Sequence, residues 1–139
     1  MIKRIFVDTK AQGLYEITQR VQEVLDGMRL EMDLEQGICN VFVRHTSASL
    51  VIQENADPTA RQDLERWLNW LVPEGEPFYR HDAEGPDDMP SHIKSALTAT
   101  SISIPILDRK LALGTWQGIY LWEHRRKGSR REIVLHFGP

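Results

Sequence analysis

The chain has 139 residues with 20 acidic and 17 basic side chains, a formal net charge of −3 and a hydrophobic share of 41%. This length and composition predict a single globular domain over residues 1–139, and the slightly acidic balance argues against nucleic-acid binding, which needs a broad positive surface. No apolar run approaches the roughly 20 residues of a membrane span, and the single cysteine, Cys39, excludes an internal disulfide, so we expect a cytoplasmic protein without membrane contact.

Local signals predict the elements of the first half of the chain. Residues 13–17 fit either the start of a helix or a strand, and the strand is favoured because Thr18 then stands as the N-cap of the helix that follows. Asp57-Pro58 predicts a second helix start, because aspartate caps well and proline suits the first helical position. The predicted elements are strands over 2–8, 13–17, 37–44 and 50–53 and helices over 18–28 and 57–72.

The second helix carries an apolar stripe and is followed by an irregular segment. Leu64, Trp67, Leu68 and Leu71 repeat at i, i+3, i+4 and i+7, so one helix face is expected to pack against the rest of the protein. After this helix, residues 74–90 have no periodicity and are rich in acidic side chains. They are expected to form a long loop, and loops of this length are commonly functional or disordered.

The final third of the chain is predicted to form an antiparallel meander. Its predicted elements are a short helix over 91–99, strands over 101–107, 111–124 and 130–137, and turns at 108–110 and 127–129. The complete set predicts an α+β fold, with mostly antiparallel β sheets in a compact sandwich-like domain that has two main helices.

One strand end combines core residues with polar ones. If Cys39, Val41 and Val43 share a buried face, His45 follows on the same side and leads into Thr46 and Ser47. This change from apolar to hydroxyl and imidazole side chains indicates the lip of a pocket, although hydroxyls that satisfy a turn would give the same pattern. In either case Cys39 itself fits an inert core position.

A glycine-flanked strand provides a second candidate. Thr115, Gln117 and Glu123 share one face of the strand after Gly114, together with apolar residues, and this face indicates a pocket wall. The opposite face is aromatic, so it needs a helix, a sheet or another subunit to cover it. The aromatic residues are Trp116, Tyr120 and Trp122.

The acidic loop contains histidines near carboxylates. His81 and His92 flank Asp88, and imidazole and carboxylate groups can together hold a divalent metal or act as acid and base. The spacing matches no standard zinc motif. Surface or capping histidines therefore stay open as the alternative.

Five segments occur in register along the chain: HTSASL at 45–50, NADP at 55–58, YRHD at 79–82, EGPDDMPSHIK at 84–94 and GTWQGI at 114–119. Together they resemble the YjbQ-like family, also called the secondary thiamine-phosphate synthase family. The similarity covers essentially the whole chain, and Gly-Thr-Trp-Gln at 114–117 is the signature of that family. One departure is Arg109, where the family usually has glycine in a turn.

The resemblance implies an α+β sandwich-like domain that assembles as a homotrimer with polar pockets near subunit boundaries. It also implies an activity, which is the joining of a pyrimidine-methyl diphosphate to a thiazole phosphate, and the word "secondary" indicates that this can be a side activity. A trimeric protein that binds a phosphorylated metabolite and a metal-dependent hydrolase remain the alternative functions.

On that chemistry, His45 and Glu123 are the expected acid and base. His81, Asp88 and His92 are expected to hold a divalent metal, Mg²⁺ or Zn²⁺, that bridges substrate phosphate oxygens. The substrate itself is expected to contact Thr46, Ser47, Asn55, Asp57, Thr115, Trp116, Gln117 and Arg131.

Overall fold

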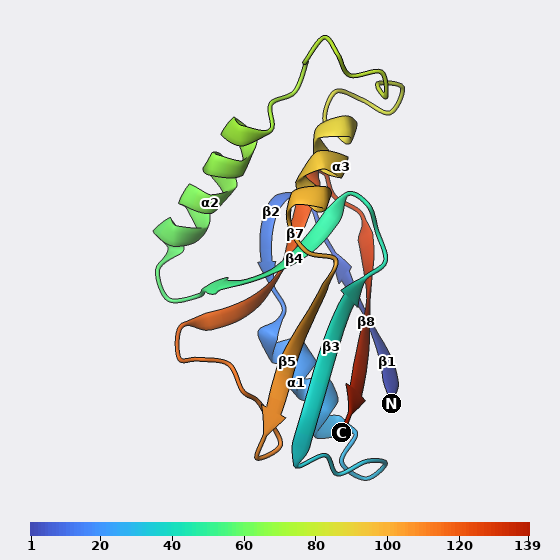
Figure 1. Ribbon diagram of the computed structural model, residues 1–139, viewed down its shortest axis with the longest axis vertical. Coiled ribbons are helices and arrows are strands. Elements are labelled where there is room, and N and C mark those ends of the chain that lie inside the picture. The colour runs from blue at the N-terminus through green and yellow to red at the C-terminus, as the bar shows by residue number, and fades with distance from the viewer.

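Eight strands and three helices follow one another in the computed structural model, which describes residues 1–139 (Figure 1). The helices are α1 (Thr18–Gly27), α2 (Pro58–Leu71) and α3 (Asp88–Leu97). The strands are β1 (Ile2–Asp8), β2 (Ala11–Glu16), β3 (Gln36–Val43), β4 (Ala48–Glu54), β5 (Ser101–Leu107), β6 (Lys110–Leu111), β7 (Gln117–Lys127) and β8 (Arg130–Gly138).

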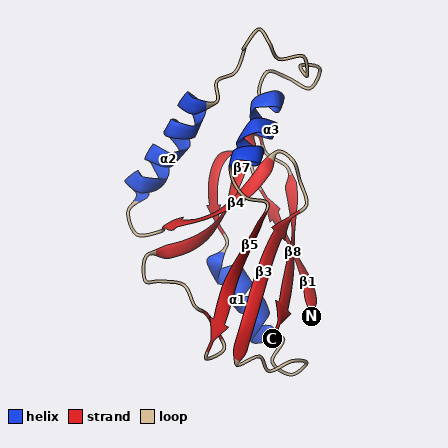
Figure 2. Ribbon diagram, in the orientation of Figure 1, coloured by secondary structure: helices blue, strands red, loops and turns tan.

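The strands form two antiparallel sheets that continue into each other. One sheet has the order β1-β8-β3-β5-β6 and the other has the order β2-β7-β4. The pairing of β1 with β8 ends at Asp8 and Arg130, and the pairing of β2 with β7 resumes at Ala11 and Lys127. The two long pairs therefore bend from one sheet into the other, so the sheets curl into a half-barrel, as Figure 2 shows in red. This confirms the predicted α+β fold with mostly antiparallel sheets.

The bend between β7 and β8 replaces a predicted turn. The sequence Lys127-Gly128-Ser129 was expected to reverse the chain, but β7 and β8 lie in different sheets, so the meander prediction is wrong. A side chain at Gly128 would collide with the backbone of Thr9, and the missing Cβ lets the two bent strands approach each other. Pairing with β1 and β2, rather than local turn chemistry, therefore decides the path of the chain here.

The main core lies between α1 and both sheets. Cys39, Val41 and Val43 are fully buried, as strand parity predicts. Thr18 is not the N-cap of α1, which is Ile17. Instead, the Thr18 hydroxyl donates to Glu16 Oε2 at 2.8 Å and accepts from the Ile119 N–H at 2.8 Å, so it links the helix to the neighbouring strands.

Helix α2 lies along one side of the β2-β7-β4 sheet (Figure 1). It begins as predicted, with Asp57 accepting a hydrogen bond from the Thr59 N–H at 2.9 Å. Of the predicted apolar stripe, Leu68 is buried against Tyr120 and Trp122, so α2 covers part of the aromatic face of β7. None of the three helices combines the length and apolarity needed to cross a bilayer.

Several apolar side chains of α2, α3 and the adjoining loops remain exposed. They are Trp67, Trp70 and Leu71 of α2, Phe78 of the long loop, Leu97 of α3 and Trp116 before β7. The stripe of α2 is thus only partly covered within one chain, whereas Tyr120 and Trp122 on the aromatic face of β7 are buried.

Candidate functional site

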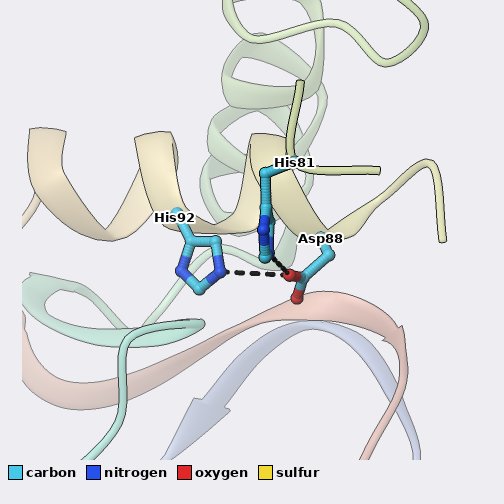
Figure 3. Close-up of side chains that lie close together, drawn as sticks. All are labelled: His81, Asp88 and His92. Atoms are coloured by element: carbon cyan, nitrogen blue, oxygen red, sulfur yellow. Dashed lines mark hydrogen bonds and ion pairs between the residues drawn. The ribbon is translucent and has the colours of Figure 1, made fainter. Parts of the chain in front are cut away.

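Two histidines and one aspartate converge at the start of α3 (Figure 3). His81 comes from the long loop, whereas Asp88 and His92 stand one helical turn apart on α3. His81 Nε2 lies 2.6 Å and His92 Nε2 lies 3.1 Å from the same oxygen, Asp88 Oδ2. The three potential ligand atoms all lie within 4.8 Å of one another, so a single ion could contact all of them.

The surrounding contacts orient these ligands. His92 Nδ1 lies 3.0 Å from the carbonyl oxygen of Thr46, which can only accept, so Nδ1 carries the proton. In the neutral ring His92 Nε2 is then an acceptor that faces a second acceptor, Asp88 Oδ2. Such an arrangement needs a shared proton or a cation, and a histidine fixed through its second nitrogen is typical of metal ligands.

The carboxylate of Asp88 is buried and anionic. Its other oxygen, Oδ1, accepts from Arg125 Nη1 at 2.6 Å, and Arg125 also binds Asp87 Oδ2 at 3.0 Å and the Glu84 carbonyl at 2.8 Å. Burial opposes ionisation, but the hydrogen bond from His81 and the neighbouring positive charges outweigh it and lower the pKa of Asp88. Arg125 therefore fixes the carboxylate in place and leaves Oδ2 for the histidine side.

The donor set distinguishes between the two expected metals. Imidazole nitrogens suit Zn²⁺ and similar transition metals, whereas Mg²⁺ prefers oxygen ligands and retains several waters. Two histidines with one carboxylate also match the ligand number of catalytic zinc sites, which keep a position open for water or substrate. The residues present fit Zn²⁺ better than Mg²⁺.

A buried ion pair lies beneath the connection between β3 and β4. Glu123 is fully buried and its carboxylate accepts four hydrogen bonds: from the Thr9 hydroxyl at 2.5 Å, the Arg125 N–H at 3.1 Å, Arg131 Nε at 2.8 Å and Arg131 Nη2. Arg131 Nη2 also donates to Ser47 Oγ at 3.0 Å. These contacts give Glu123 and Arg131 a positioning role at the bend between the sheets, while their predicted acid–base and substrate-binding roles stay predictions.

His45 lies beside this pair. Its Nε2 accepts from the Glu132 N–H at 2.8 Å, so the neutral ring carries its proton on Nδ1. Burial and the positive charge of Arg131 lower the pKa of His45, which favours the neutral ring at neutral pH. Thr46, the next residue, is exposed and provides the carbonyl that orients His92. The structure thus brings Thr46 into contact with the histidine–aspartate cluster, whereas the contacts of His45 and Ser47 are with Glu132 and Arg131.

The remaining predicted substrate residues lie elsewhere in the chain. In the pairing of β4 with β7, Ala48 faces Glu123 at one end and Glu54 faces Gln117 at the other. Six strand steps of about 3.3 Å separate these ends by about 20 Å. The distant group comprises Asn55, Asp57, Thr115, Trp116 and Gln117, and one chain does not bring it to the cluster.

Residues of the distant group form local contacts. The Asn55 N–H donates to the Trp116 carbonyl at 3.0 Å, and Gln117 Oε1 accepts from the Gly114 N–H at 2.7 Å. Asp57 caps α2. The Trp116 side chain is 64% exposed, so it is free to meet another molecule or subunit.

The sequence analysis missed three polar residues that the structure places at important positions. The sequence predicts no site role for Arg125, and Lys94 appears only within the segment 84–94 that resembles the family. His124 follows the parity of Trp122, and this signal could have predicted its burial. The pairing of Arg125 with Asp88 joins segments 37 residues apart, which no local pattern indicates.

Comparison with known proteins agrees with this architecture. The family described as "UPF0047 protein YjbQ-like" matches residues 3–138. A UPF0047 protein of Synechocystis is 48% identical over 132 residues, covering 95% of this chain and 87% of the relative. The UPF0047 protein YjbQ of Salmonella typhimurium is 43% identical over 132 residues, covering 95% and 93%.

Solved structures give the same result for the fold. A crystal structure of a YjbQ/UPF0047 family protein from Clostridium acetobutylicum has a TM-score of 0.86 at 32% identity and covers 98% of this chain and 99% of that chain. A conserved hypothetical protein from Thermus thermophilus has a TM-score of 0.84 at 34% identity, with the same coverage. The names of these relatives state no activity. On sequence and structure together, the chain belongs to the YjbQ-like (UPF0047) family.

Proposed function

We propose that this protein is a metal-dependent enzyme that acts on phosphorylated substrates, and that it catalyses transfer of the thiamine-phosphate synthase type. The observation that carries the proposal is the convergence of His81 Nε2, His92 Nε2 and Asp88 Oδ2 within 4.8 Å of one another. The Thr46 carbonyl orients the His92 ring through Nδ1, so that Nε2 of the neutral ring can bind a cation beside Asp88, as in metal-binding histidines.

In the proposed reaction, the bond between the pyrimidine methylene and the diphosphate oxygen breaks, and the thiazole nitrogen forms a new bond to that methylene. A divalent cation held by His81, Asp88 and His92 would supply the charge that neutralises the departing diphosphate. The exposed hydroxyl of Thr46 and the Nδ1–H of His45 can donate hydrogen bonds to phosphate oxygens. Both residues are at or next to Thr46, whose carbonyl orients His92. Arg131 and Glu123 hold the neighbouring Ser47 in place.

We also propose that the working unit is a homotrimer. Asn55, Thr115, Trp116 and Gln117 are far from the cluster of their own chain, so a neighbouring subunit must supply them if they contact the same substrate. The exposed apolar residues around α2 and α3 support a subunit contact, since such patches typically mark interfaces. A cytoplasmic location stays a prediction that rests on the single, buried cysteine.

Metal analysis together with product formation tests the proposal. Purified protein would be measured for bound metal and incubated with both thiamine precursors and Zn²⁺ or Mg²⁺. We expect about one zinc per chain and formation of thiamine phosphate, and both should be lost in His92→Ala and Asp88→Asn. His136→Ala is the matched control, because His136 is an exposed histidine in β8, outside the cluster. Full metal content and activity in the His92→Ala variant would show that the cluster is not the site.

A hydrolase is the second candidate. The two-histidine, one-carboxylate set supports it, because catalytic zinc sites of this composition activate water. Release of phosphate from a phosphate ester without any thiazole acceptor would distinguish hydrolysis from transfer. Saturable binding of a precursor with no product would instead identify the protein as a binding protein for a phosphorylated metabolite.

A further inference from the structure

A second polar site lies between α2, α3, β2 and β7, and it shares no residue with the histidine–aspartate cluster. A cavity of about 140 Å³ occupies this position, and its wall includes Gln12, Glu65, Asn69, Lys94 and His124. Water takes up about 30 Å³ per molecule in the liquid, so the cavity holds a ligand the size of a few waters. An adjoining hollow of about 340 Å³ shares Gln12, Asn69 and Lys94 and extends to Arg126, which connects the cavity with the surface.

His124, one of the residues of this wall, has an unpartnered ring nitrogen. The residue is 1% exposed, its Nε2 lies 2.8 Å from Ser49 Oγ, and its Nδ1 is the only buried side-chain nitrogen or oxygen without a hydrogen-bond partner. Buried polar atoms in folded proteins are almost always paired, so an unpaired nitrogen on a residue that lines a cavity indicates a missing partner. If the Ser49 hydroxyl donates to Nε2, Nδ1 carries a proton and is a donor.

Lys94 contributes a buried positive charge. It is 4% exposed and has no carboxylate within salt-bridge distance, and the hydrogen bond from its Nζ to Asn69 Oδ1 at 2.5 Å is the one side-chain contact that the ammonium makes. An ammonium group has three donors, so two remain for a ligand. Burial lowers the pKa of Lys94, and the negative charges of Glu74 and Asp87, which form no ion pair with it, oppose this shift only in part. An anion in direct contact with the ammonium would stabilise its charged form.

The amide groups around Lys94 are arranged to hold it in this position. Asn69 Nδ2 donates to Gln12 Oε1 at 2.9 Å, and Gln12 Nε2 donates to the His124 carbonyl at 3.0 Å. These hydrogen bonds direct the Asn69 side-chain oxygen at Lys94 and connect Asn69 through Gln12 to the backbone of β7. Glu65 is the acid in the wall, and its Oε1 is occupied by the Leu14 N–H at 2.9 Å.

We propose that this cavity binds one small oxyanion, a carboxylate or a phosphate, through Lys94 Nζ and His124 Nδ1. The site would be independent of the metal cluster, although α3 carries residues of both. The proposal does not depend on the transferase chemistry proposed above.

Nuclear magnetic resonance of the histidine ring nitrogens tests the site directly. The protein, with its metal as purified, would be titrated with inorganic phosphate in one arm and with acetate in the other. We expect a saturable shift of the His124 Nδ1 resonance in at least one arm, and the arm that saturates at lower concentration identifies the anion class. No saturable shift of this resonance in either arm would overturn the proposal, and this measurement needs no variant.

Two variants test the role of the charge. Lys94→Met keeps the length of the side chain and removes the ammonium, so we expect binding to weaken about tenfold or more. Lys127→Met, which removes an exposed lysine at the end of β7, is the control and should bind like the unmodified protein. Equal affinity in folded Lys94→Met would refute the assignment. Metal content should stay unchanged in both variants, which separates this test from that of the metal cluster.

Discussion

Replacing Glu123 by glutamine should destabilise the fold strongly, because it removes the negative partner of a buried ion pair. The carboxylate is fully buried and accepts four hydrogen bonds, two of them from Arg131, whose side chain is also buried. A glutamine amide keeps one oxygen and presents an NH₂ group where donors now converge. Arg131 would keep its charge without a partner.

The expected loss can be placed on an energy scale. Removing one partner of a buried ion pair typically costs about 3–5 kcal/mol, because the other charge stays buried and uncompensated. Urea denaturation followed by circular dichroism measures this loss as a lower midpoint. Glu31→Gln is the matched control: Glu31 forms an exposed pair with Lys3 at 3.2 Å, and such pairs contribute about 1 kcal/mol or less.

A double variant separates the ion pair from its surroundings. Glu123→Leu combined with Arg131→Met removes both charges, and apolar replacements of buried pairs are often neutral or stabilising. We therefore expect the double variant to recover much of the stability that Glu123→Gln loses. A loss below about 1 kcal/mol in Glu123→Gln would refute the structural role. If that variant stayed fully folded, kept its metal content and lost activity, Glu123 would instead act as the acid or base.

Three further predictions concern single positions. Gly128→Ala should lower the unfolding free energy by about 1–3 kcal/mol or more, because its Cβ would overlap the Thr9 backbone, whereas Gly27→Ala, where a Cβ meets nothing, should not. Burial lowers the pKa of His124 to about 3, below the 6.5 of the unfolded chain, so the unfolded state binds more protons between these values. The unfolding free energy should therefore fall by up to about 1.4 kcal/mol per pH unit as the pH drops through this window. In His124→Gln, urea denaturation at a series of pH values should show a dependence of the unfolding free energy on pH that is smaller by that amount. Burial also raises the pKa of the Cys39 thiol to about 12, so a thiol-reactive dye should label it only after unfolding; rapid labelling of the native protein would contradict the core position.

The strands with clear local patterns were predictable from the sequence. The strands predicted over 2–8 and 101–107 have the same bounds in the structure, and Asp57 caps α2 as predicted. These features depend on alternation and on the chemistry of one capping residue, so a few neighbours suffice to specify them.

The bend at Gly128 was not predictable in the same way. A Lys-Gly-Ser segment between two strands resembles a hairpin turn. Only the pairing of β7 and β8 with β2 and β1, which lie more than a hundred positions away in the sequence, shows that the chain continues instead of reversing. The glycine is needed for close approach to Thr9 rather than for a turn. Pairing across the sheets therefore overrides the local signal.

The candidate site was partly predictable. The three residues of the cluster were chosen from the sequence, and Asp88 and His92 share one helix face because α3 begins at Asp88, earlier than the predicted start at 91. Pro90 lies in the first turn of this helix, where proline is tolerated. The roles of Arg125 and Lys94 depend on contacts between distant segments, and the sequence alone does not specify such contacts.

The bend between the two sheets explains why the polar residues gather where they do. At this bend backbone hydrogen bonds continue between the two long strands, from the Thr9 N–H to the Ser129 carbonyl at 3.0 Å and from the Gly128 N–H to the Lys10 carbonyl at 3.1 Å. Beside them, the Glu123 carboxylate accepts from the Thr9 hydroxyl and from Arg131. Arg131 then holds Ser47, and the preceding residue, Thr46, presents its carbonyl to His92. The ion pair and the candidate metal centre are therefore joined by one short path of contacts. A variant that breaks the ion pair but still folds should weaken metal binding, because His92 would lose the fixed carbonyl that orients its ring.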